Sequence, residues 1–511
     1  MLPNSLLLIG ILLCAWIHLP AQYLTYVSDI KPILERHCVK CHTEGEVGAM
    51  PLTTYEEVSS YGKMIQYVTS SRLMPPWYAD PTYSHFANER LLSADEIEKI
   101  SHWVEDDMHE GALPYGMTYS KSVAVNVVPR LPDVVLPMQE AFEQYGVYLD
   151  QYQVFVIPTR LDNDQWIEGI EFVPGNKKIV RAASISLAPH SQFDSLDRWD
   201  PRYGYYSFGG LGKSPSFHYW YTWSPQQKLS WWTEGRAKFL PKNSDLLVHI
   251  HYGPTGKPQK DSSMIRLWFT SKKINQPIIS VPLINPYVLT NDSFYIAANT
   301  KQIFHARYTV PYDIQLLSLT PQANLICRSW EMYALIPDQR DPVKLLKIND
   351  WNFNWKQTYR FASPVILPKG SVVHCLAQYD NTLENPCNPS DRPVDIGWGA
   401  HIFNELLFVH AEMMFADTSL PVQLQIPVVV SSNSMAFTLD SPMKSRVSLY
   451  LTDAFGNTQS ILRRYKMRRG PSTLSIPLGV LSNGNYLLEV RGKKEELLGC
   501  QIFIKMKTNG M

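Results

Sequence analysis

The sequence carries little charge for its length and no net charge. Of its 511 residues 18% are charged, and lysine plus arginine balance aspartate plus glutamate at 47 each. A balanced chain lacks the polybasic field on which nucleic-acid binding depends, so we expect no nucleic-acid partner. Hydrophobic residues make up 45% of the chain, which excludes wholesale disorder. A chain of this length predicts about three or four domains.

Long hydrophobic runs are missing beyond the N-terminus. The run Leu6–Leu13, continued by Cys14–Ala21, is short and close to the first residue, which favours a secretory signal peptide at 1–22 over a spanning helix. An uncleaved N-terminal anchor is the alternative. We therefore expect an exported protein, in the periplasm or at the outer cell surface, that is not an integral membrane protein.

Cysteine is scarce, with seven in the chain. Cys14 belongs to the expected signal peptide, and two further cysteines belong to the motif described next. The remaining four allow at most two disulfides in three connectivities, which the sequence leaves open. The nearest pair could close a loop. These four are Cys327, Cys375, Cys387 and Cys500.

The segment Cys38-Val39-Lys40-Cys41-His42 has the pattern of a c-type haem attachment site. Its two thiols would form thioethers with the haem vinyl groups, and the adjacent histidine would bind the iron. A zinc site would need a second pair of ligands at suitable spacing, and a thioredoxin-like site would need a βαβ setting. Neither is apparent, so the motif predicts haem c held by Cys38, Cys41 and His42.

The flanks of this motif predict helices. The last of them begins with Ser93 and Glu96, which form a plausible capping box. Residues 23–115 resemble a small cytochrome c domain, most specifically at the haem motif and at Met-Pro-Pro-Trp, residues 74–77. The resemblance implies an all-α domain. Helices are expected at Ile30–Arg36, Tyr55–Ser70 and Ser93–Asp107.

Met74 is the predicted sixth ligand of the haem iron. Met50 follows His42 too closely to reach the other haem face, and Met64 lies mid-helix, where a core position is expected. The two prolines after Met74 fix its backbone, which suits holding a thioether against iron. His/Met ligation favours electron transfer. The alternative is a buried Met74 with His85 as second ligand, or an open iron.

Between residues 130 and 417 the hydrophobic period changes to two, with turns rich in Gly, Pro, Asn and Asp, which predicts β-strands. We expect two antiparallel, jelly-roll-like β-sandwiches, at 130–275 and 276–417. Strands are expected at Val154–Pro158, Trp166–Phe172, Ile179–Leu187, Asp245–Tyr252, Met264–Thr270, Thr309–Leu317, Ser329–Leu335, Gln357–Phe361, Val372–Tyr379 and Leu406–Met413.

This middle region resembles the copper type II, ascorbate-dependent monooxygenases, the family of peptidylglycine hydroxylase and dopamine β-monooxygenase. Bacterial members of that family that are fused to an N-terminal cytochrome c are familiar. The resemblance implies two separated coppers, one held by three imidazoles and the other by two imidazoles and a methionine thioether. It rests on Ile170–Asn176, Leu247–Gly253, Asp350–Trp355, Pro368-Lys369-Gly370 and Tyr379-Asp380-Asn381.

Most of the copper ligands that the resemblance implies are replaced. Of the six implied copper ligands, only the histidine at position 251 is present. His251 and His249 lie on the same face of one strand, and two histidines in this arrangement could bind a metal only weakly. Copper is therefore not expected, and the scaffold is predicted to have lost hydroxylase activity. Arg181, which occupies the first replaced position, is a cation and could bind an anion there. The five replaced positions are Arg181, Ala182, Gln322, Asn324 and Leu406.

The C-terminal segment, residues 420–511, is basic, with 12 lysines and arginines in residues 418–511 against 5 acidic residues. Its strand and turn pattern resembles the sorting domain of type IX secretion substrates in Bacteroidota, which implies a small β-sandwich that addresses the protein to the outer surface. The run Arg463–Arg469 is either a docking patch or a solvated hairpin. Strands are expected at Ser445–Leu451, Ser472–Leu478, Gly484–Val490 and Cys500–Met506.

Three functions remain open on the sequence. The first is an exported haem c electron-transfer protein, a pseudoenzyme whose degenerate sandwiches serve as a binding or docking platform. The second is an active copper monooxygenase that receives electrons from its own cytochrome domain. The third is a structural surface protein. The first predicts an unknown redox partner protein and a possible small ligand between the sandwiches.

Overall fold

The computed structural model describes residues 23–112, 130–146, 148–211, 219–225, 227, 229–233, 235–274, 276–399, 401–416, 422–426, 429–430, 433–453, 457–482 and 484–505. The expected signal peptide, with Cys14, lies outside these residues. The described chain forms two compact units. The first comprises residues 23–39, 52–75 and 92–112, and the second comprises 40–51, 76–91 and everything described from 130 onward.

The predicted fold class is wrong in its first part. Of the described residues, 44% lie in β-strands and 11% in short helices, and no all-α cytochrome domain is evident among them. The stretch 23–115 is shared between the two units because its loops 40–51 and 76–91 belong to the β-rich unit. Trp77, Ala79 and Phe86 on the second loop are buried in a β-sheet core, and removing their apolar surface from water stabilises this placement of the loop.

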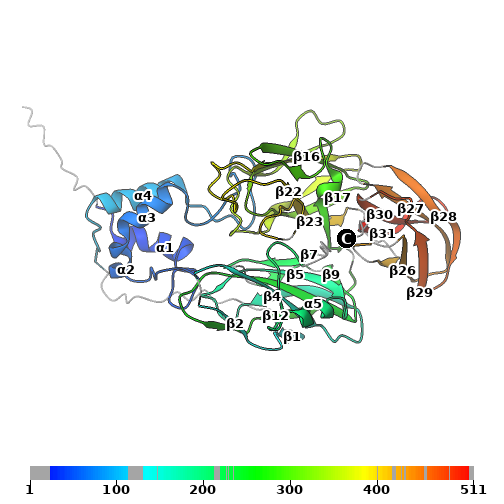
Figure 1. Ribbon diagram of the computed structural model, residues 1–511, viewed down its shortest axis with the longest axis horizontal. Helices are drawn as coiled ribbons and strands as arrows, with labels where there is room; N and C mark the ends of the chain where they lie inside the picture. Colours follow the sequence, from blue (N-terminus) through cyan, green and yellow to red (C-terminus); the bar gives the residue numbers. More distant parts are fainter. Residues whose placement is uncertain are drawn as a thin grey trace, which may run out of the picture. The chain divides into compact units, whose positions relative to one another are not determined.

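The first unit consists of short helices, coloured blue in Figure 1. The predicted capping box is confirmed: the Ser93 side chain accepts from the Glu96 N–H, and the Glu96 side chain accepts from the Ser93 N–H. The predicted helix Tyr55–Ser70 breaks at Tyr61. Met64 is 52% exposed rather than in a core. The helices are η1 (Tyr26–Ile30, a π-helix), α1 (Lys31–His37), α2 (Tyr55–Ser60), α3 (Gly62–Ser70) and α4 (Ala94–Glu105).

In the second unit, residues 134–277 form two facing sheets around a shared core. One sheet has the order β1 (Val134–Pro137), β12 (Met264–Phe269), β4 (Gln165–Val173), β9 (Arg236–Leu240) and β13 (Gln276–Pro277), with β8 (Ser230–Trp231) beside β4. The other has the order β6 (Tyr205–Tyr206), β3 (Gln151–Pro158), β10 (Ser244–Tyr252), β5 (Val180–Pro189) and β7 (Tyr219–Trp223). Outside them lie β2 (Phe142–Gln144), β11 (Gln259–Asp261) and α5 (Asp194–Trp199). Apolar burial alternates along β4 of the first sheet, whereas β3, β7 and β10 of the second sheet are buried along nearly their whole length.

Residues 279–415 form a second pair of facing sheets. The expected strand Thr309–Leu317 is wrong, since the chain turns there from one strand to the next. One sheet has the order β14 (Ile279–Ile284), β23 (Phe408–Phe415), β17 (Ile314–Gln322) and β20 (Tyr359–Leu367). The other has the order β16 (Lys301–Thr309), β21 (Val372–Asp380), β18 (Cys327–Leu335) and β19 (Val343–Ile348). Short elements are η2 (Pro286–Val288), β15 (Tyr295–Ile296) and β22 (Ile396–Gly397).

The C-terminal strands enclose a further core and are coloured orange to red in Figure 1. One sheet has the order β24 (Gln423–Gln425), β26 (Ser434–Ser441) and β29 (Gly470–Pro477). The other has the order β25 (Val429–Val430), β31 (Leu497–Lys505), β30 (Gly484–Arg491), β27 (Ser445–Asp453) and β28 (Thr458–Met467). The basic run Arg463–Arg469 begins on β28.

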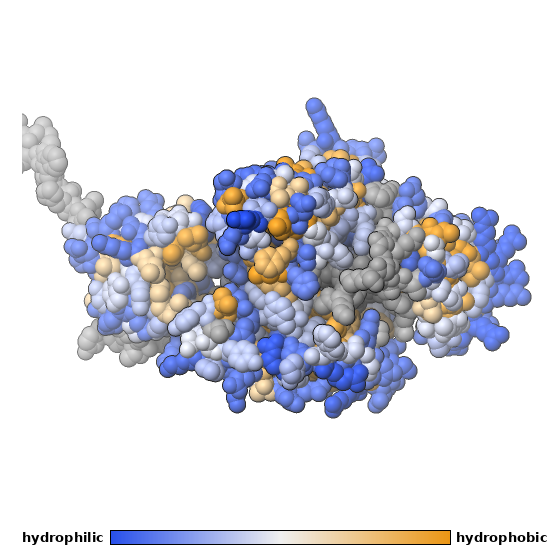
Figure 2. Space-filling model, viewed as in Figure 1, coloured by the Kyte–Doolittle hydropathy of each residue, from blue (hydrophilic) through white to orange (hydrophobic). Residues whose placement is uncertain are grey.

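Two further features concern the chain surface and its cysteines. On the face shown in Figure 2, polar side chains predominate and apolar ones lie in small groups. Among the described residues, no helix is both long and apolar enough to cross a membrane.

Cys327 and Cys375 are buried, Cys387 is exposed and Cys500 is half-buried, and none of these four forms a disulfide.

Candidate functional site

The haem motif begins where α1 ends. The N–H of Cys38 donates to the Leu34 carbonyl at 2.7 Å, which closes the last helical turn. Cys41 and His42 follow in consecutive turns, and all three side chains are half-buried. Both thiols are therefore reachable for a covalent reaction with haem.

The imidazole of His42 is oriented by a backbone carbonyl. Its Nδ1 lies 2.9 Å from the Met50 carbonyl oxygen. A carbonyl only accepts hydrogen bonds, so Nδ1 carries the proton and the lone pair of the neutral ring is on Nε2. A histidine that ligates a metal through Nε2 is commonly held in this way, with the other ring nitrogen donating to a carbonyl. The donor set of the segment thus fits a c-type haem.

Gly48 makes this arrangement possible. Its N–H donates to the Cys41 carbonyl at 2.9 Å. A Cβ on Gly48 would lie 2.6 Å from that carbonyl oxygen and 2.8 Å from His42 Nδ1, which is closer than real Cβ atoms approach. The sequence analysis missed this role, for which the only sequence signal is a glycine six residues after the motif.

The predicted sixth ligand lies on the first unit. Met74 is in the loop after α3, where its N–H donates to the Val68 carbonyl at 2.9 Å and its side chain is 40% exposed. The alternative ligand, His85, belongs to the second unit and is exposed. Its Nδ1 lies 3.2 Å from a Glu89 carboxylate oxygen.

Only some of the residues at the six implied copper positions lie close together. Ala182 on β5 lies opposite His251 on β10, and both border a cavity of about 30 Å³ that Gln322 and His249 also line. Leu406 borders an adjoining cavity of about 30 Å³, also lined by Gln322 and His249. Four of the six ligand positions therefore lie around two small adjoining cavities.

The other two positions point elsewhere. Arg181 donates from Nη1 to the Val47 carbonyl at 3.3 Å, and the Lys177 ammonium pairs with Glu46 at 2.6 Å. These bonds hold the loop 40–51 on the first sandwich, so Arg181 does not line the cavity where a copper was expected. Asn324 is buried and donates from Nδ2 to the Asn404 carbonyl at 2.9 Å.

Both histidines of β10 are engaged in hydrogen bonds. His249 Nε2 lies 2.7 Å from the Ser207 carbonyl, and His251 Nε2 lies 2.9 Å from Asp150 Oδ1. Burial lowers the pKa of His249 to about 3 and also lowers that of His251. Both imidazoles are therefore neutral at physiological pH and serve the fold through Nε2.

A lysine and a glutamate that the sequence analysis did not single out titrate near this cavity. Lys356 borders it, with Nζ 3.9 Å from the centroid of the Phe353 ring, and burial lowers its pKa to about 7. Burial raises the pKa of Glu405 to about 7, although its carboxylate accepts the N–H groups of Asn324 and Ile326 at 2.8 Å. Each charge partly offsets the shift in the other.

The side chains at the copper positions do not fit the two-copper arrangement that the resemblance implies. Ala182 and Leu406 offer no donor atom, and the amide of Gln322 donates to the Tyr219 hydroxyl at 3.1 Å. Cu(I) sites rely on imidazole, thiolate and thioether ligands. Within the part of the chain that the structure describes, no three His, Cys, Asp or Glu residues form a group that could hold a metal.

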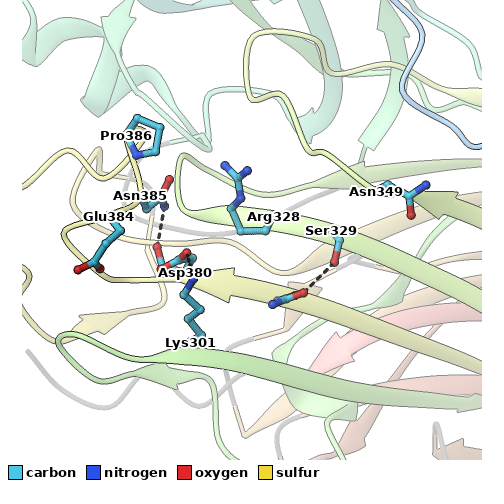
Figure 3. A pocket seen from close by; sticks show the side chains of 9 residues that line it. Lys301, Arg328, Ser329, Asn349, Asp380, Glu384, Asn385 and Pro386 are labelled. Carbon is cyan, nitrogen blue, oxygen red and sulfur yellow. Dashed lines mark hydrogen bonds and ion pairs between the residues drawn. The ribbon is translucent and has the colours of Figure 1, made fainter. Parts of the chain in front are cut away.

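A larger polar pocket of about 470 Å³ lies over β16, β18 and β21 (Figure 3). Both of its cations are already paired: the Lys301 ammonium lies 3.0 Å from Asp380, and Arg328 lies 3.2 Å from Asp350. The pocket contains no residue that the sequence analysis predicted for a site. It is lined by Lys301, Arg328, Ser329, Asn349, Gln378, Asp380, Glu384, Asn385 and Pro386.

Comparisons with known proteins give no family. No family model and no curated protein matches the chain. Matching solved structures include a biofilm-associated protein BSP domain, at 8% identity over 78% of this chain and 85% of that one, with a TM-score of 0.14. A β-glucuronidase from Ruminococcus gnavus matches at 10% identity over 40% and 35% of the two chains, with a TM-score of 0.12. A β-1,2-glucanase from Parabacteroides distasonis matches at 12% identity over 47% and 34%, with a TM-score of 0.14.

Proposed function

We propose that this protein is a haem c electron-transfer protein, with haem bound covalently to Cys38 and Cys41 and its iron ligated by His42. The observation that carries the proposal is the hydrogen bond from His42 Nδ1 to the Met50 carbonyl, which leaves Nε2 as the ligating nitrogen. When bound, the haem supplies reversible one-electron exchange. The residues of the chain fix its position and the orientation of the axial imidazole.

Met74 is our proposed second axial ligand. It is the methionine of the Met-Pro-Pro-Trp sequence, and its thioether would raise the reduction potential relative to a second imidazole. His85 is the weaker candidate because its ring is engaged with the Glu89 carboxylate. Replacing Met74 with His or Ala should shift the potential, whereas an His85→Ala chain should keep the wild-type value.

We further propose that the sandwiches bind no copper pair and act as a docking platform, for the haem segment itself and for a redox partner protein. The Lys177–Glu46 ion pair and the bond from Arg181 to Val47 support the first role. The absence of donor atoms at Ala182 and Leu406 argues against an active copper monooxygenase, the second candidate. No observation favours the third, a purely structural surface protein.

Export remains part of the proposal. It rests on the apolar segment Leu6–Leu13 and on the resemblance of residues 420–511 to a type IX sorting domain. A protein exposed at the outer surface would be accessible to protease added to intact cells, whereas a periplasmic protein would be protected until the outer membrane is opened.

The test of the main proposal is metal analysis of the full chain, produced in a host that attaches haem c, with a reduced visible spectrum of the same sample. We expect about one iron per chain in covalently bound haem and negligible copper. A Cys41→Ser chain should lose covalent haem, and a Cys387→Ser chain, altered at an exposed thiol, should keep it. A wild-type chain without covalent haem would refute the proposal. Tightly bound copper would instead favour the monooxygenase.

A further inference from the structure

One edge of the C-terminal sandwich is strongly basic. β28 is the edge strand of its sheet and pairs with β27 (Figure 1). Seven lysines and arginines on these two strands and on the turns that flank them are exposed, and none of them forms an ion pair with a described carboxylate. On the next strand, β30, and the turn after it, Glu489 and Glu495 are already paired with Arg491. We call the seven residues the basic edge: Lys444, Arg446, Arg463, Arg464, Lys466, Arg468 and Arg469.

A β-bulge turns two successive arginines to the solvent side of β28. Opposite Ser448, β28 contains one residue more than β27. Within this bulge Arg464 has a φ of 57°, a left-handed conformation that is uncommon for a residue other than glycine. Leu462 and Tyr465, which flank the bulge, pack on the core, so Arg463 and Arg464 both face solvent. The bulge therefore places on one surface two cations that a regular strand would direct to opposite faces.

Two further cations of the basic edge lie directly opposite each other. Arg446 on β27 is in register with Lys466 on β28. Like charges at directly opposed positions of two antiparallel strands are destabilising. Cations along an edge strand discourage pairing with another sheet, but that role needs no second cation on the inner strand. An external anion between the two side chains would offset their repulsion.

An exposed methionine adjoins the basic edge. Met443 is 44% exposed in the turn before β27, and the Ser441 hydroxyl donates to its carbonyl at 2.8 Å, which fixes this turn. Because Ser445 pairs with Met467, the turn lies beside the end of β28, where Arg468 follows. An apolar side chain among cations fits a surface of lipid headgroups, where the cations meet phosphates and the apolar group enters the acyl boundary. Protein interfaces favour aromatic anchors, and none of the described aromatic rings of this sandwich is largely exposed.

We propose that the basic edge binds the phosphate groups of an anionic lipid surface. A guanidinium presents two parallel N–H groups that match two phosphate oxygens, and a lysine adds a point charge. Polybasic clusters that bind lipid headgroups contain about four to eight cations, and the basic edge falls within this range. The contact would compensate the repulsion between Arg446 and Lys466 and would bury Met443. The inference concerns a surface outside the haem segment and holds whether or not the chain carries haem.

Flotation of the full chain with lipid vesicles tests the inference. The vesicles consist of phosphatidylcholine, either alone or mixed with phosphatidylglycerol as the anionic lipid. We expect the chain to bind only the anionic vesicles, and to bind them less as salt is raised, because salt screens exposed charges. Removing two cations with the double variant Arg446→Gln/Lys466→Gln should lower the partition coefficient about 30-fold. The same variant should unfold at a higher urea concentration than wild type, because the like-charge pair is gone.

The matched control is the double variant Lys493→Gln/Lys494→Gln. It removes the same number of exposed cations from the same sandwich, in the turn after β30 and outside the basic edge. We expect this control to keep the wild-type binding. Met443→Ser, which removes the apolar side chain and keeps every cation, should weaken binding to the anionic vesicles by less than the double variant of the basic edge.

Four outcomes would overturn the proposal. The first is a wild-type chain that does not bind the anionic vesicles, or that loses equal affinity in the test and control variants. The second is equal binding to neutral vesicles, which would assign the contact to apolar insertion alone. The third is binding to polyglutamate in place of the vesicles, which would assign the basic edge to an acidic protein. The fourth is self-association at low salt without vesicle binding, removed by Arg446→Gln/Lys466→Gln, which would assign it to a second copy of the chain.

Discussion

At the scale of single residues, Gly48 sets the geometry of the haem segment. A side chain on Gly48 would collide with the Cys41 carbonyl and with the His42 ring. We expect Gly48→Ala to open this turn, to break the bond from His42 to Met50 and to cost about 1–3 kcal/mol of stability. Covalent haem should remain, because both thiols remain, but the low-spin reduced spectrum should weaken. Gly397→Ala is the control, since a Cβ there meets nothing within 4 Å. A wild-type spectrum in Gly48→Ala would contradict the assignment.

Also at the scale of single residues, Glu405 and Lys356 should make the free energy of unfolding change with pH in opposite directions. Burial raises the pKa of Glu405 from 4.5 to about 7, so the folded chain holds this proton more tightly and the free energy of unfolding falls as pH rises through that window. Burial lowers the pKa of Lys356 from 10.5 to about 7, so the unfolded chain binds more protons above pH 7 and stability rises there.

Urea unfolding at a series of pH values checks this prediction. Relative to wild type, Glu405→Gln should gain stability as pH rises from 4.5 to about 7. Glutamine has no carboxyl to ionise, so the variant does not lose stability over this window as the wild type does. Lys356→Met should lose relative stability as pH rises from about 7 to 10.5. Variant and wild-type curves that stay parallel over these windows would show that the two groups are not buried as described.

At the scale of elements, the capping box of α4 should contribute measurably to the first unit. The Ser93 hydroxyl accepts the Glu96 N–H at 3.1 Å, and Glu96 Oε2 accepts the Ser93 N–H at 2.8 Å. Ser93→Ala should therefore cost about 0.5–2 kcal/mol, measured by chemical unfolding followed by the helical circular dichroism. Ser101→Ala, inside the same helix, should be neutral or slightly stabilising because alanine favours helix interiors. Equal effects of the two changes would argue against the cap.

At the scale of the whole molecule, Phe86 attaches the loop 76–91 to the β-rich unit. It is 4% exposed, its ring centroid lies 5.3 Å from those of Tyr359 and Phe361, and it forms an isolated β-bridge with Phe361. Phe86→Ala should cost about 3–5 kcal/mol and should expose this loop to limited proteolysis. Phe403→Ala, which alters a ring that is 53% exposed, should leave both stability and cleavage unchanged. Protection of the loop in Phe86→Ala would show that other contacts hold it.

How much of this could be predicted from the sequence depends on the range of the interaction. The capping box and the strands β3, β4, β10, β18 and β21 were predicted because each depends on neighbours within a few residues. The haem motif is equally local, and haem attachment stays a prediction. The strand expected at Thr309–Leu317 was wrong because the chain leaves β16 after Thr309 and begins β17 at Ile314, with Pro311 and Asp313 in the connection.

The sequence by itself determined the local patterns, namely the thiols and histidine of the CxxCH motif, the helix cap, the strand periodicity and the residues at the positions where the resemblance implies copper ligands. Only the tertiary structure decided that the loops 40–51 and 76–91 belong to the β-rich unit, that Arg181 bonds to Val47 and that Arg446 lies opposite Lys466. The physical reason is that burial and charge compensation depend on partners far away in the chain, as Phe86 depends on Phe361.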